Sequence, residues 1–445
     1  MKILQYTTGL PPVRRGGLPA YSTDLSVYLA QEHRVTVVYP GRMPFYQTNK
    51  IKFIPKKDDR YPFEVFEIWN PLPVSLGYGI AKAAPYYERR DMHPIMEFLK
   101  SINPDVIHLH TIIGLPIEFL KAAKNLGIKL IYTTHDYFGL CPKMLQSNTG
   151  EELRKKTCSY ECMLCKNGPS LTKIRIMQTN LYSWLKDTKV LKSLRRTQKN
   201  KINVEVGDSA LLQEDEATDR YKQRIYYLNA FRLIDQFHFN SSVSKKYFEQ
   251  FFPEIVGKVI NITHDGLTDN RSISHEAICD NIRIGFVGTY DSRKGFYLFT
   301  KVIKELRKDF TNFSVRFYGD VTENQVFKET WVENEGVVSS AEMKDAYQKM
   351  DLLVLLSLWK ETFGFVVLEA LANGVPCLVS ENVGAKDLLP NQWILADEKE
   401  LMKKITDILK EPQDRLGDMR DNVLRLPLPL SFDDHARQIV KQFYR

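Results

Sequence analysis

Short runs of apolar residues alternate with longer amphipathic stretches over roughly the first 135 residues. A short apolar run bounded by turn residues is typical of a buried parallel strand, and apolar residues about three or four apart are typical of a helix. The strands that this pattern predicts are Lys2–Tyr6, Arg34–Tyr39, Val106–Leu109 and Lys129–Thr133. The predicted helices between them include Ala20–Glu32 and Pro116–Leu126. This alternation predicts a parallel sheet with helices on both faces.

The alternation breaks after residue 140 and returns near residue 282. The second set of predicted strands is Ile282–Gly288, Ser314–Gly319, Leu352–Leu356 and Pro376–Ser380. The sequence therefore predicts an α/β protein with two doubly wound, Rossmann-like domains. Open parallel sheets bind ligands at the carboxyl ends of their strands, so we expect the two domains to face a common cleft.

We expect the N-terminal domain to span residues 1–267, with a cysteine-containing and basic helical insertion at about 141–232. The C-terminal domain is expected at residues 281–427, and a last helix at about 428–445 is expected to pack back onto the N-terminal domain. A chain of 445 residues exceeds the usual size of one hydrophobic core, which agrees with two domains.

The composition is that of an ordinary globular protein, with 43% apolar and 26% charged residues. No apolar run is long enough to cross a bilayer, and the first residues resemble a strand and a turn rather than a signal peptide. We therefore expect a cytoplasmic protein with reduced cysteines. The net charge of +8 suits a phosphorylated ligand, nucleic acid or an anionic membrane surface. Because no nucleic-acid-binding motif is present, we expect no nucleic acid partner.

The most informative motif starts at Glu361 and runs through Gly364 and Glu369 to Pro376, after the apolar strand that ends near Leu356. The free N–H groups of the predicted helix start can hold a phosphate. Ionised carboxylates only accept hydrogen bonds, so the two glutamates suit sugar or ribose hydroxyls. The alternative is an ordinary amphipathic helix with two solvated glutamates. This alternative is the better explanation for either glutamate alone, but not for the whole segment.

Two glycine-containing turns also follow predicted strands. In the first, Gly288 ends a strand and is followed by Arg293 and Lys294, which could neutralise a departing diphosphate. In the second, Gly16 and Gly17 precede the helix near Ala20 and allow a ligand to approach closely. The alternatives are a plain strand-helix turn with surface cations and a flexible turn.

Histidines and an aspartate lie at two further strand ends. His108 falls inside the strand pattern and is expected in the core, whereas His110 and His135 lie at the strand ends, where a substrate could reach them. Asp136 directly follows His135. We expect His110 and Asp136 on the side of a second substrate.

These motifs together resemble glycosyltransferase family 4, whose members are retaining enzymes of the GT-B fold. The resemblance rests on Glu361 and Glu369 with Phe-Gly between them, on the turn from Gly288 to Lys294, on the glycine pair and on the His-Asp turn. It runs along nearly the whole chain and is weakest over residues 141–226.

The resemblance implies a role for each motif residue. Glu369 would bind the donor ribose, Glu361 the donor sugar, and Lys294 the leaving diphosphate. The remaining donor-binding residues that it implies are Gly16, Gly17, Gly288, Arg293, Thr362, Phe363, Gly364 and Phe365. His135 would contact the transferring sugar, so the implied catalytic residues are His135, Glu361 and Lys294. The family often has Arg after the glycine at Gly288, and Arg293 could replace the charge that Thr289 lacks.

The resemblance implies a retaining glycosyltransferase that takes a sugar from a UDP- or GDP-sugar and acts in polysaccharide or glycan assembly. We expect no cofactor for catalysis and no catalytic metal, because no Asp-x-Asp motif follows an apolar strand. Two other classes stay open: a nucleotide-sugar epimerase or phosphorylase of GT-B-like fold, and a non-catalytic donor-binding partner subunit.

Two features fall in the predicted insertion. Four cysteines lie close in sequence and could hold a structural zinc ion or stay unliganded: Cys141, Cys158, Cys162 and Cys165. Residues 173–201 hold nine Lys/Arg and one acidic residue with interspersed aromatic and aliphatic side chains. Such a helix could lie on an anionic membrane surface, which would make the protein peripheral on the inner face of the cell membrane and favour a lipid-linked acceptor. The alternative is a solvated helix packed on the N-terminal domain.

Overall fold

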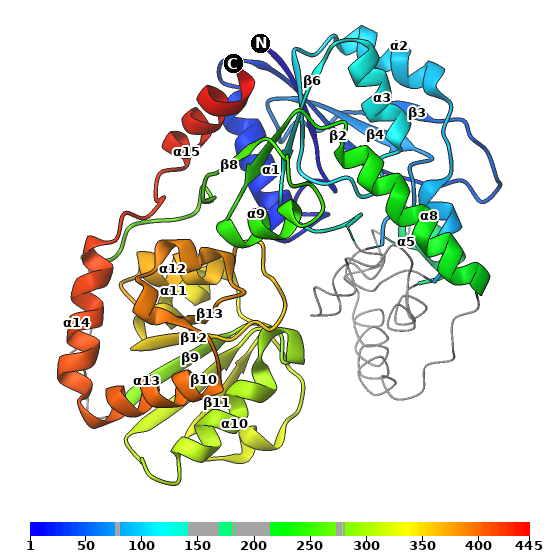
Figure 1. Cartoon of the computed structure of the whole chain (residues 1–445). Coiled ribbons are helices and arrows are strands. Elements are labelled where there is room, and N and C mark those ends of the chain that lie inside the picture. Colours follow the sequence, from blue (N-terminus) through cyan, green and yellow to red (C-terminus); the bar gives the residue numbers. More distant parts are fainter. Residues whose placement is uncertain (76–80, 141–168, 180–181, 183–213, 273–277, 279–280) are drawn as a thin grey trace. The chain divides into compact units, whose positions relative to one another are not determined.

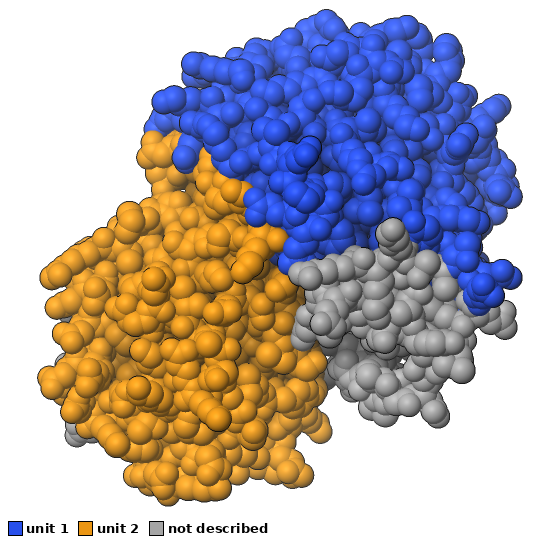
Figure 2. Space-filling model, in the orientation of Figure 1, with its two compact units in different colours: residues 1–239, 247–258, 436–445 blue, residues 240–246, 259–435 orange. Residues whose placement is uncertain are grey.

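The computed structural model describes residues 1–75, 81–140, 169–179, 182, 214–272, 278 and 281–445. In these ranges the chain divides into two compact units (Figure 2). Unit 1 comprises residues 1–239, 247–258 and 436–445, and unit 2 comprises residues 240–246 and 259–435. Each unit has its own mostly parallel sheet, which confirms the prediction of two doubly wound α/β domains.

The boundary between the units differs from the one expected at residues 267–281. Unit 2 already includes the chain from Val259, because β8 (Gly257–Val259) is the last strand of the unit 1 sheet and the chain leaves that sheet there. The chain returns to unit 1 at Ala436, within α15 (Phe432–Ile439).

The described part of unit 1 carries an eight-stranded sheet in the order β3-β4-β2-β1-β5-β6-β7-β8 (Figure 1). Its other strands are β1 (Lys2–Tyr6), β2 (Arg34–Pro40), β3 (Lys52–Lys56), β4 (Glu64–Trp69), β5 (Val106–Leu109), β6 (Lys129–Thr133) and β7 (Gln236–Phe239). The helices are α1 (Gly17–Leu29), η1 (Ala84–Tyr87), α2 (Met92–Ile102), α3 (Ile117–Asn125), α5 (Leu171–Met177), α8 (Glu214–Phe231), α9 (Ser242–Glu249), which continues from unit 2, and the last turn η8 (Val440–Tyr444).

The central strands of unit 1 are buried because helices cover both faces of the sheet. All four residues of β5 are buried, and β1 is buried after its first residue. β1 lies between β2 and β5 and pairs in parallel with both. The crossovers from β1 to β2 and from β5 to β6 run in opposite directions along the sheet, so right-handed connections place α1 and α3 on opposite faces. The carboxyl ends of β1 and β5 therefore flank a topological switch point.

The described part of unit 2 carries a six-stranded parallel sheet in the order β11-β10-β9-β12-β13-β14. Its strands are β9 (Ile282–Val287), β10 (Phe313–Tyr318), β11 (Val332–Gly336), β12 (Leu352–Leu355), β13 (Cys377–Ser380) and β14 (Ile394–Leu395). Its helices are η4 (Ser292–Lys294), α10 (Phe296–Leu306), η5 (Gln325–Lys328), α11 (Ser340–Gln348), α12 (Phe365–Ala372), η6 (Gly384–Leu388), η7 (Asn391–Trp393), α13 (Glu398–Lys410), α14 (Pro412–Arg425) and the start of α15.

A buried charge cluster fixes the amino ends of the two central strands of unit 2. Asp351 is fully buried at the start of β12, and its Oδ2 lies 3.0 Å from Arg283 Nε on β9. Arg420 on α14 contacts the other carboxylate oxygen at 2.7 Å. Because both guanidinium groups pair with one carboxylate, the charge of Asp351 is compensated where it is desolvated. The loops that carry the motifs follow the opposite, carboxyl ends of β9 and β12.

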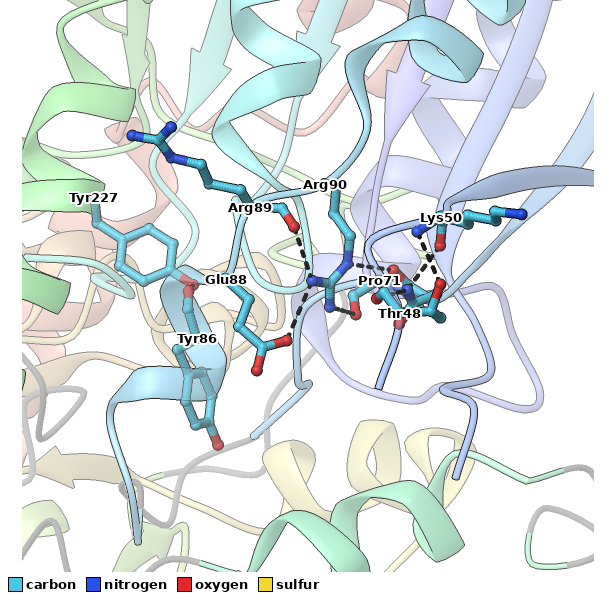
Figure 3. Close-up of polar contacts among 9 residues, drawn as sticks. Thr48, Lys50, Pro71, Tyr86, Glu88, Arg89, Arg90 and Tyr227 are labelled. Atoms are coloured by element: carbon cyan, nitrogen blue, oxygen red, sulfur yellow. Dashed lines mark hydrogen bonds and ion pairs between the residues drawn. The ribbon is translucent and has the colours of Figure 1, made fainter. Parts of the chain in front are cut away.

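A buried arginine organises the loops beside β4 in unit 1 (Figure 3). Arg90 is 4% exposed, and its Nε donates to the Asn70 carbonyl at 3.0 Å. Its other nitrogens donate to the Pro71 carbonyl at 3.2 Å and to Glu88 Oε2 at 3.3 Å. Asn70 has a φ of 62° and donates in turn to the Thr48 carbonyl at 2.9 Å. The guanidinium group therefore joins its own segment to residues 70–71 by supplying donors to their carbonyls, and the Asn70 side chain adds the segment at Thr48.

Candidate functional site

The loops that carry the Glu361 and Lys294 motifs leave neighbouring strands at the switch point of the unit 2 sheet. β9 and β12 pair in parallel, with Gly285 opposite Leu353. From β9 the chain winds toward β10 and β11, and from β12 it winds toward β13 and β14. The loops after β9 and β12 therefore diverge at their carboxyl ends, which is where open α/β sheets bind ligands.

The turn after β9 is held by Asp291. Its Oδ1 accepts a hydrogen bond from the Lys294 backbone N–H at 3.2 Å, and its Oδ2 accepts from the Thr289 hydroxyl at 2.8 Å. The Arg293 guanidinium lies 2.9 Å from the same Oδ2. Burial acts to raise the pKa of Asp291, but Arg293 and these hydrogen bonds outweigh it and hold the pKa below its usual value. Arg293 thus pairs with the turn's own carboxylate.

Lys294 itself points across to the loop after β12. Its Nζ lies 2.6 Å from Glu361 Oε1, and the Ser357 hydroxyl donates to the same oxygen. The Glu361 side chain is 7% exposed and that of Lys294 is 29% exposed. Two motif residues that are 67 positions apart in sequence therefore form one ion pair at the switch point.

The backbone around Glu361 is fixed by the loop after β13. The Glu361 N–H donates to the Asn382 carbonyl at 2.8 Å, and the Gly384 N–H donates to the Glu361 carbonyl at 3.1 Å. Gly364 has a φ of 103° and precedes α12. A Cβ atom there would lie 3.3 Å from Glu361 Oε2 and 3.2 Å from Val383 Cγ1. Glycine at position 364 therefore allows both the left-handed backbone and the approach of the carboxylate to the helix start.

The neighbouring residues of the motif are held by backbone contacts. The Ser241 hydroxyl donates to the Thr362 carbonyl at 2.5 Å, and the Ala385 N–H donates to the Phe363 carbonyl at 2.7 Å. The Phe365 ring packs edge-on against His264, with ring centroids 5.4 Å apart. The helix start that the sequence predicted as a phosphate site is thus anchored on both sides.

Glu369 lies on α12 and contacts two side chains from other segments. Its Oε2 accepts from the Tyr347 hydroxyl at 2.9 Å, and its Oε1 lies 3.4 Å from His264 Nε2. The Glu369 side chain is 29% exposed. Burial, followed by the nearby Glu369 charge, raises the pKa of Tyr347 well above its usual value, so this phenol stays a donor. Tyr347 and His264 were not predicted from the sequence, because neither lies in a motif.

The glycine pair of unit 1 begins α1. Gly16 caps this helix with a φ of 126°, and both Gly16 and Gly17 are exposed. A Cβ atom built at Gly16 would meet only Pro19, at 4.0 Å, among the described residues. The helix start is therefore uncrowded at this glycine.

His110 is fully buried, whereas we expected a substrate to reach it. Its Nε2 lies 2.7 Å from Gln5 Oε1 and its Nδ1 lies 3.3 Å from His135 Nε2, so both ring nitrogens face other side chains. His135 and Asp136 are only partly buried. Asp136 Oδ1 accepts from the Phe138 N–H at 2.9 Å, and burial raises the pKa of this carboxyl to about 6.

The other predictions of the sequence concern the insertion. Cys141, Cys158, Cys162 and Cys165 lie outside the described residues. Of the basic stretch at 173–201, the structure describes residues 173–179 and 182. Within the ranges that it describes, no group of three or more His, Cys, Asp or Glu side chains is arranged to hold a metal ion. In those same ranges, no helix has the length and apolar character needed to cross a bilayer.

Known structures share this chain's fold at low sequence identity. HepE from Anabaena, solved with UDP and glucose, is 15% identical, with a TM-score of 0.54 over 99% of this chain and 98% of that one. An alpha,alpha-trehalose-phosphate synthase (UDP-forming) from Burkholderia xenovorans, solved with glucose-6-phosphate, is 10% identical, with a TM-score of 0.57 over 100% and 99%. These neighbours and the two doubly wound sheets define a protein of the GT-B class.

Two family matches narrow this class. Residues 281–411 match the family described as Glycosyl transferases group 1, and residues 15–158 match Glycosyltransferase Family 4. The chain belongs to glycosyltransferase family 4. It is also 23% identical to an "Uncharacterized 42.6 kDa protein in cps region" of Klebsiella pneumoniae, over 78% of this chain and 70% of the relative.

Proposed function

We propose that this chain transfers a sugar from a nucleoside-diphosphate sugar to an acceptor hydroxyl, with retention of configuration and without a catalytic metal. The observation that carries the proposal is the contact between Lys294 and Glu361 at the switch point of unit 2. It joins a cation to a carboxylate where a doubly wound sheet binds its ligand.

Lys294 has the chemistry needed for the leaving group. In the transfer, the bond between the sugar's anomeric carbon and the donor phosphate oxygen breaks, and a bond from that carbon to the acceptor oxygen forms. The acceptor hydroxyl releases its proton to water or to the departing phosphate oxygen, and the diphosphate leaves with the electron pair of the broken bond and added negative charge. An ammonium group has three N–H donors, so its contact with Glu361 leaves two for phosphate oxygens. One well-placed donor of this kind stabilises a transition state by about 3 kcal/mol.

The two glutamates suit the hydroxyls of the donor. Glu361 is held by Ser357 and Lys294, and its second oxygen lies beside Gly364 at the start of α12. We propose that it orients the sugar and that Glu369 binds the ribose. Each carboxylate oxygen has two lone pairs, so Glu369 can accept further hydrogen bonds beyond those of its neighbours.

The proposal also covers residues of unit 1, the donor nucleotide and the acceptor. We propose that Gly16 and Gly17 border the donor phosphates and that His135 contacts the transferring sugar. The Anabaena neighbour was solved with UDP, which favours a uridine donor over GDP. The relative in a cps region favours polysaccharide assembly, and a lipid-linked acceptor at the inner membrane face remains part of the proposal.

A thermal-shift screen tests donor binding directly. The full chain is heated with UDP-, GDP- and ADP-sugars, each with and without EDTA. A donor present at 100 times its dissociation constant should stabilise the folded state by about 2.7 kcal/mol, and the chelator should not reduce the shift. Glu369→Gln should weaken the shift with every donor that carries a ribose. A shift that disappears with EDTA would contradict the metal-independent mechanism.

Product analysis then separates transfer from other chemistry. The donor that binds is incubated with candidate acceptors, and the products are identified by mass spectrometry and NMR. An α-linked product from an α-linked donor supports retention. A donor converted to its epimer, or a sugar phosphate formed from inorganic phosphate, would replace the proposal with an epimerase or a phosphorylase. Full biological activity in Glu361→Ala would indicate a non-catalytic subunit.

Metal analysis of the purified protein addresses the cysteine cluster separately. One zinc per chain that is lost when Cys158 and Cys162 are both changed to serine would support a structural zinc site. A stoichiometry near zero would remove zinc from the proposal without affecting the transferase mechanism.

A further inference from the structure

The centre of unit 1 contains a continuous network of polar side chains. It links four neighbouring strands to the last turn of the chain, η8. Its members are Gln5 on β1, His108 on β5, His110 after β5, Thr133 on β6, His135 after β6, His238 on β7 and Tyr444 on η8. All are buried except His135, which is partly exposed. Buried polar groups of this kind must satisfy one another, so the direction of each hydrogen bond constrains the next.

The Gln5 amide sets the direction of the hydrogen bonds that lead to His110 and His135. Its Nε2 donates to the Tyr444 hydroxyl at 3.0 Å, which leaves Oε1 facing His110 Nε2 at 2.7 Å. An amide oxygen only accepts, so His110 must carry its proton on Nε2.

The protonation of His110 determines which ring donates in its contact with His135. Burial, followed by the neighbouring His108, His135 and His238, lowers the pKa of His110 well below its usual value, so the ring is neutral. A neutral imidazole has one N–H, which leaves His110 Nδ1 as an acceptor. His135 Nε2 lies 3.3 Å from it and must donate.

The hydrogen bonds that run from Tyr444 to His238 are consistent with the same orientation of the Gln5 amide. The Tyr444 hydroxyl accepts from Gln5 and donates to His108 Nδ1 at 2.7 Å. His108 Nε2 then donates to Thr133 Oγ1 at 2.7 Å, and that hydroxyl donates to His238 Nδ1 at 2.9 Å. In each of these contacts one donor meets one acceptor.

We propose that Gln5 and Tyr444 are positioning residues that hold His135 in its Nε2–H tautomer, with the lone pair on Nδ1. A sugar hydroxyl that meets Nδ1 must then donate its hydrogen bond. The Tyr21 ring, with its centroid 4.8 Å from that of His135, packs against the imidazole. The part of this inference that concerns sugar transfer rests on the proposed function, whereas the tautomer assignment does not.

The tautomer can be measured without any substrate. The full chain is labelled with ¹⁵N-histidine, and long-range ¹H–¹⁵N spectra are recorded at pH 8. Single His→Gln variants assign the signals. We expect protonated Nε2 and unprotonated Nδ1 for His110, His135 and His238 alike. The opposite tautomer for His110 and His135 would mean that the Gln5 amide is turned round, and it would overturn the inference.

Variants then test which residues impose the tautomer. Gln5→Met removes both amide contacts at similar volume, and Tyr444→Phe removes only the hydroxyl at the other end. In both, the His135 Nε2 signal should move toward the unprotonated range as the second tautomer becomes populated. Tyr132→Phe on β6 is the matched control, because its buried hydroxyl has no hydrogen-bond partner among the described residues. An unchanged His135 spectrum in both variants would refute the positioning role. If Gln5→Met does not fold, Tyr444→Phe decides alone.

Transfer assays complete the test. If His135 acts on the sugar, Gln5→Met and Tyr444→Phe should lower kcat roughly tenfold with a smaller change in KM, and Tyr132→Phe should leave kcat unchanged. A wild-type chain without transfer would refute the proposed function and leave the tautomer result standing. A wild-type rate in both network variants would instead refute the positioning of His135.

Discussion

Replacing Lys294 by methionine tests the ion pair at the switch point of unit 2. Methionine keeps the unbranched stem beside Gly288 and removes the charge. Exposed ion pairs contribute about 0–1 kcal/mol to stability, and breaking a buried pair costs about 3–5 kcal/mol. This pair lies between these limits, because Glu361 is 7% exposed and Lys294 is 29% exposed. We expect the free energy of unfolding to fall by about 1–3 kcal/mol.

The expected effect on catalysis is separate from the effect on stability. A cation that stabilises the leaving diphosphate contributes about 3 kcal/mol to the transition state, so Lys294→Met should lower kcat about 100-fold. The double variant Lys294→Met/Glu361→Gln removes both charges, and the amide oxygen of the new glutamine can still accept from Ser357. It should recover most of the stability and none of the kcat. Initial rates of nucleoside diphosphate release and urea unfolding curves give the two quantities.

A matched control shows whether the loss of another lysine charge in this segment has the same effect. Lys301→Met removes another lysine from the same strand-helix segment. The Lys301 side chain is 71% exposed and pairs with Glu398 at 2.9 Å, so stability and kcat should both stay close to the wild type. If Lys294→Met loses stability but keeps kcat within about threefold of the wild type, the pair is structural and the proposed mechanism is refuted.

Three further predictions concern stability and reactivity. Arg90→Met should lower the free energy of unfolding by about 3 kcal/mol because it leaves buried carbonyls without donors, while the exposed Arg89→Met should not, as urea unfolding would show. Burial raises the Asp136 pKa from 3.8 to about 6, so the stability that this group contributes is full below about pH 4 and is lost as the pH rises through 6. Asp136→Asn should therefore match the wild type at pH 4 and exceed it by about 2–3 kcal/mol at pH 8; equal stability at both pH values would contradict the shift. Burial also raises the pKa of the Cys377 thiol, so alkylation followed by peptide mass spectrometry should label it only after unfolding, and rapid labelling of the native chain would contradict its burial.

Four strands of each unit could be predicted from their short apolar runs, namely β1, β2, β5 and β6 in unit 1 and β9, β10, β12 and β13 in unit 2. β9 and β10 begin and end within one residue of the predicted ranges. The edge strands were not predicted, and neither were β4 and β7, which lie inside the unit 1 sheet. β3 reads Lys-Phe-Ile-Pro-Lys, and β11 has three exposed polar residues in its middle. Edge strands bury little side-chain surface and often carry Lys or Pro, so their sequences lack the apolar run that marks a central strand.

The candidate site could likewise be predicted only where residues close together in the sequence determine it. Strand ends are local features, and their placement was enough to suggest that Lys294 and Glu361 belong together. Tyr347 and His264 contact Glu369 from α11 and from the segment before β9, and no motif marks either residue. The burial of His110 depends on a network that also contains Tyr444, which comes from the far end of the chain.

The two switch points differ in what fills them, and this difference bears on function. In unit 1, side chains of the chain itself occupy the region where β1 and β5 end, and they pair as donors and acceptors that fix ring orientations. In unit 2, the ends of β9 and β12 present a partly exposed ammonium group beside a nearly buried carboxylate. A neutral buried network resists the entry of charge, because no group in it can compensate a phosphate without protonation. A partly solvated ion pair can exchange one partner for a phosphate at a smaller cost. The described residues of unit 2 therefore fit the anionic part of the donor better than the buried network of unit 1 does, and Gly16 and Gly17, which lie outside that network, stay the residues of unit 1 that we propose beside the phosphates.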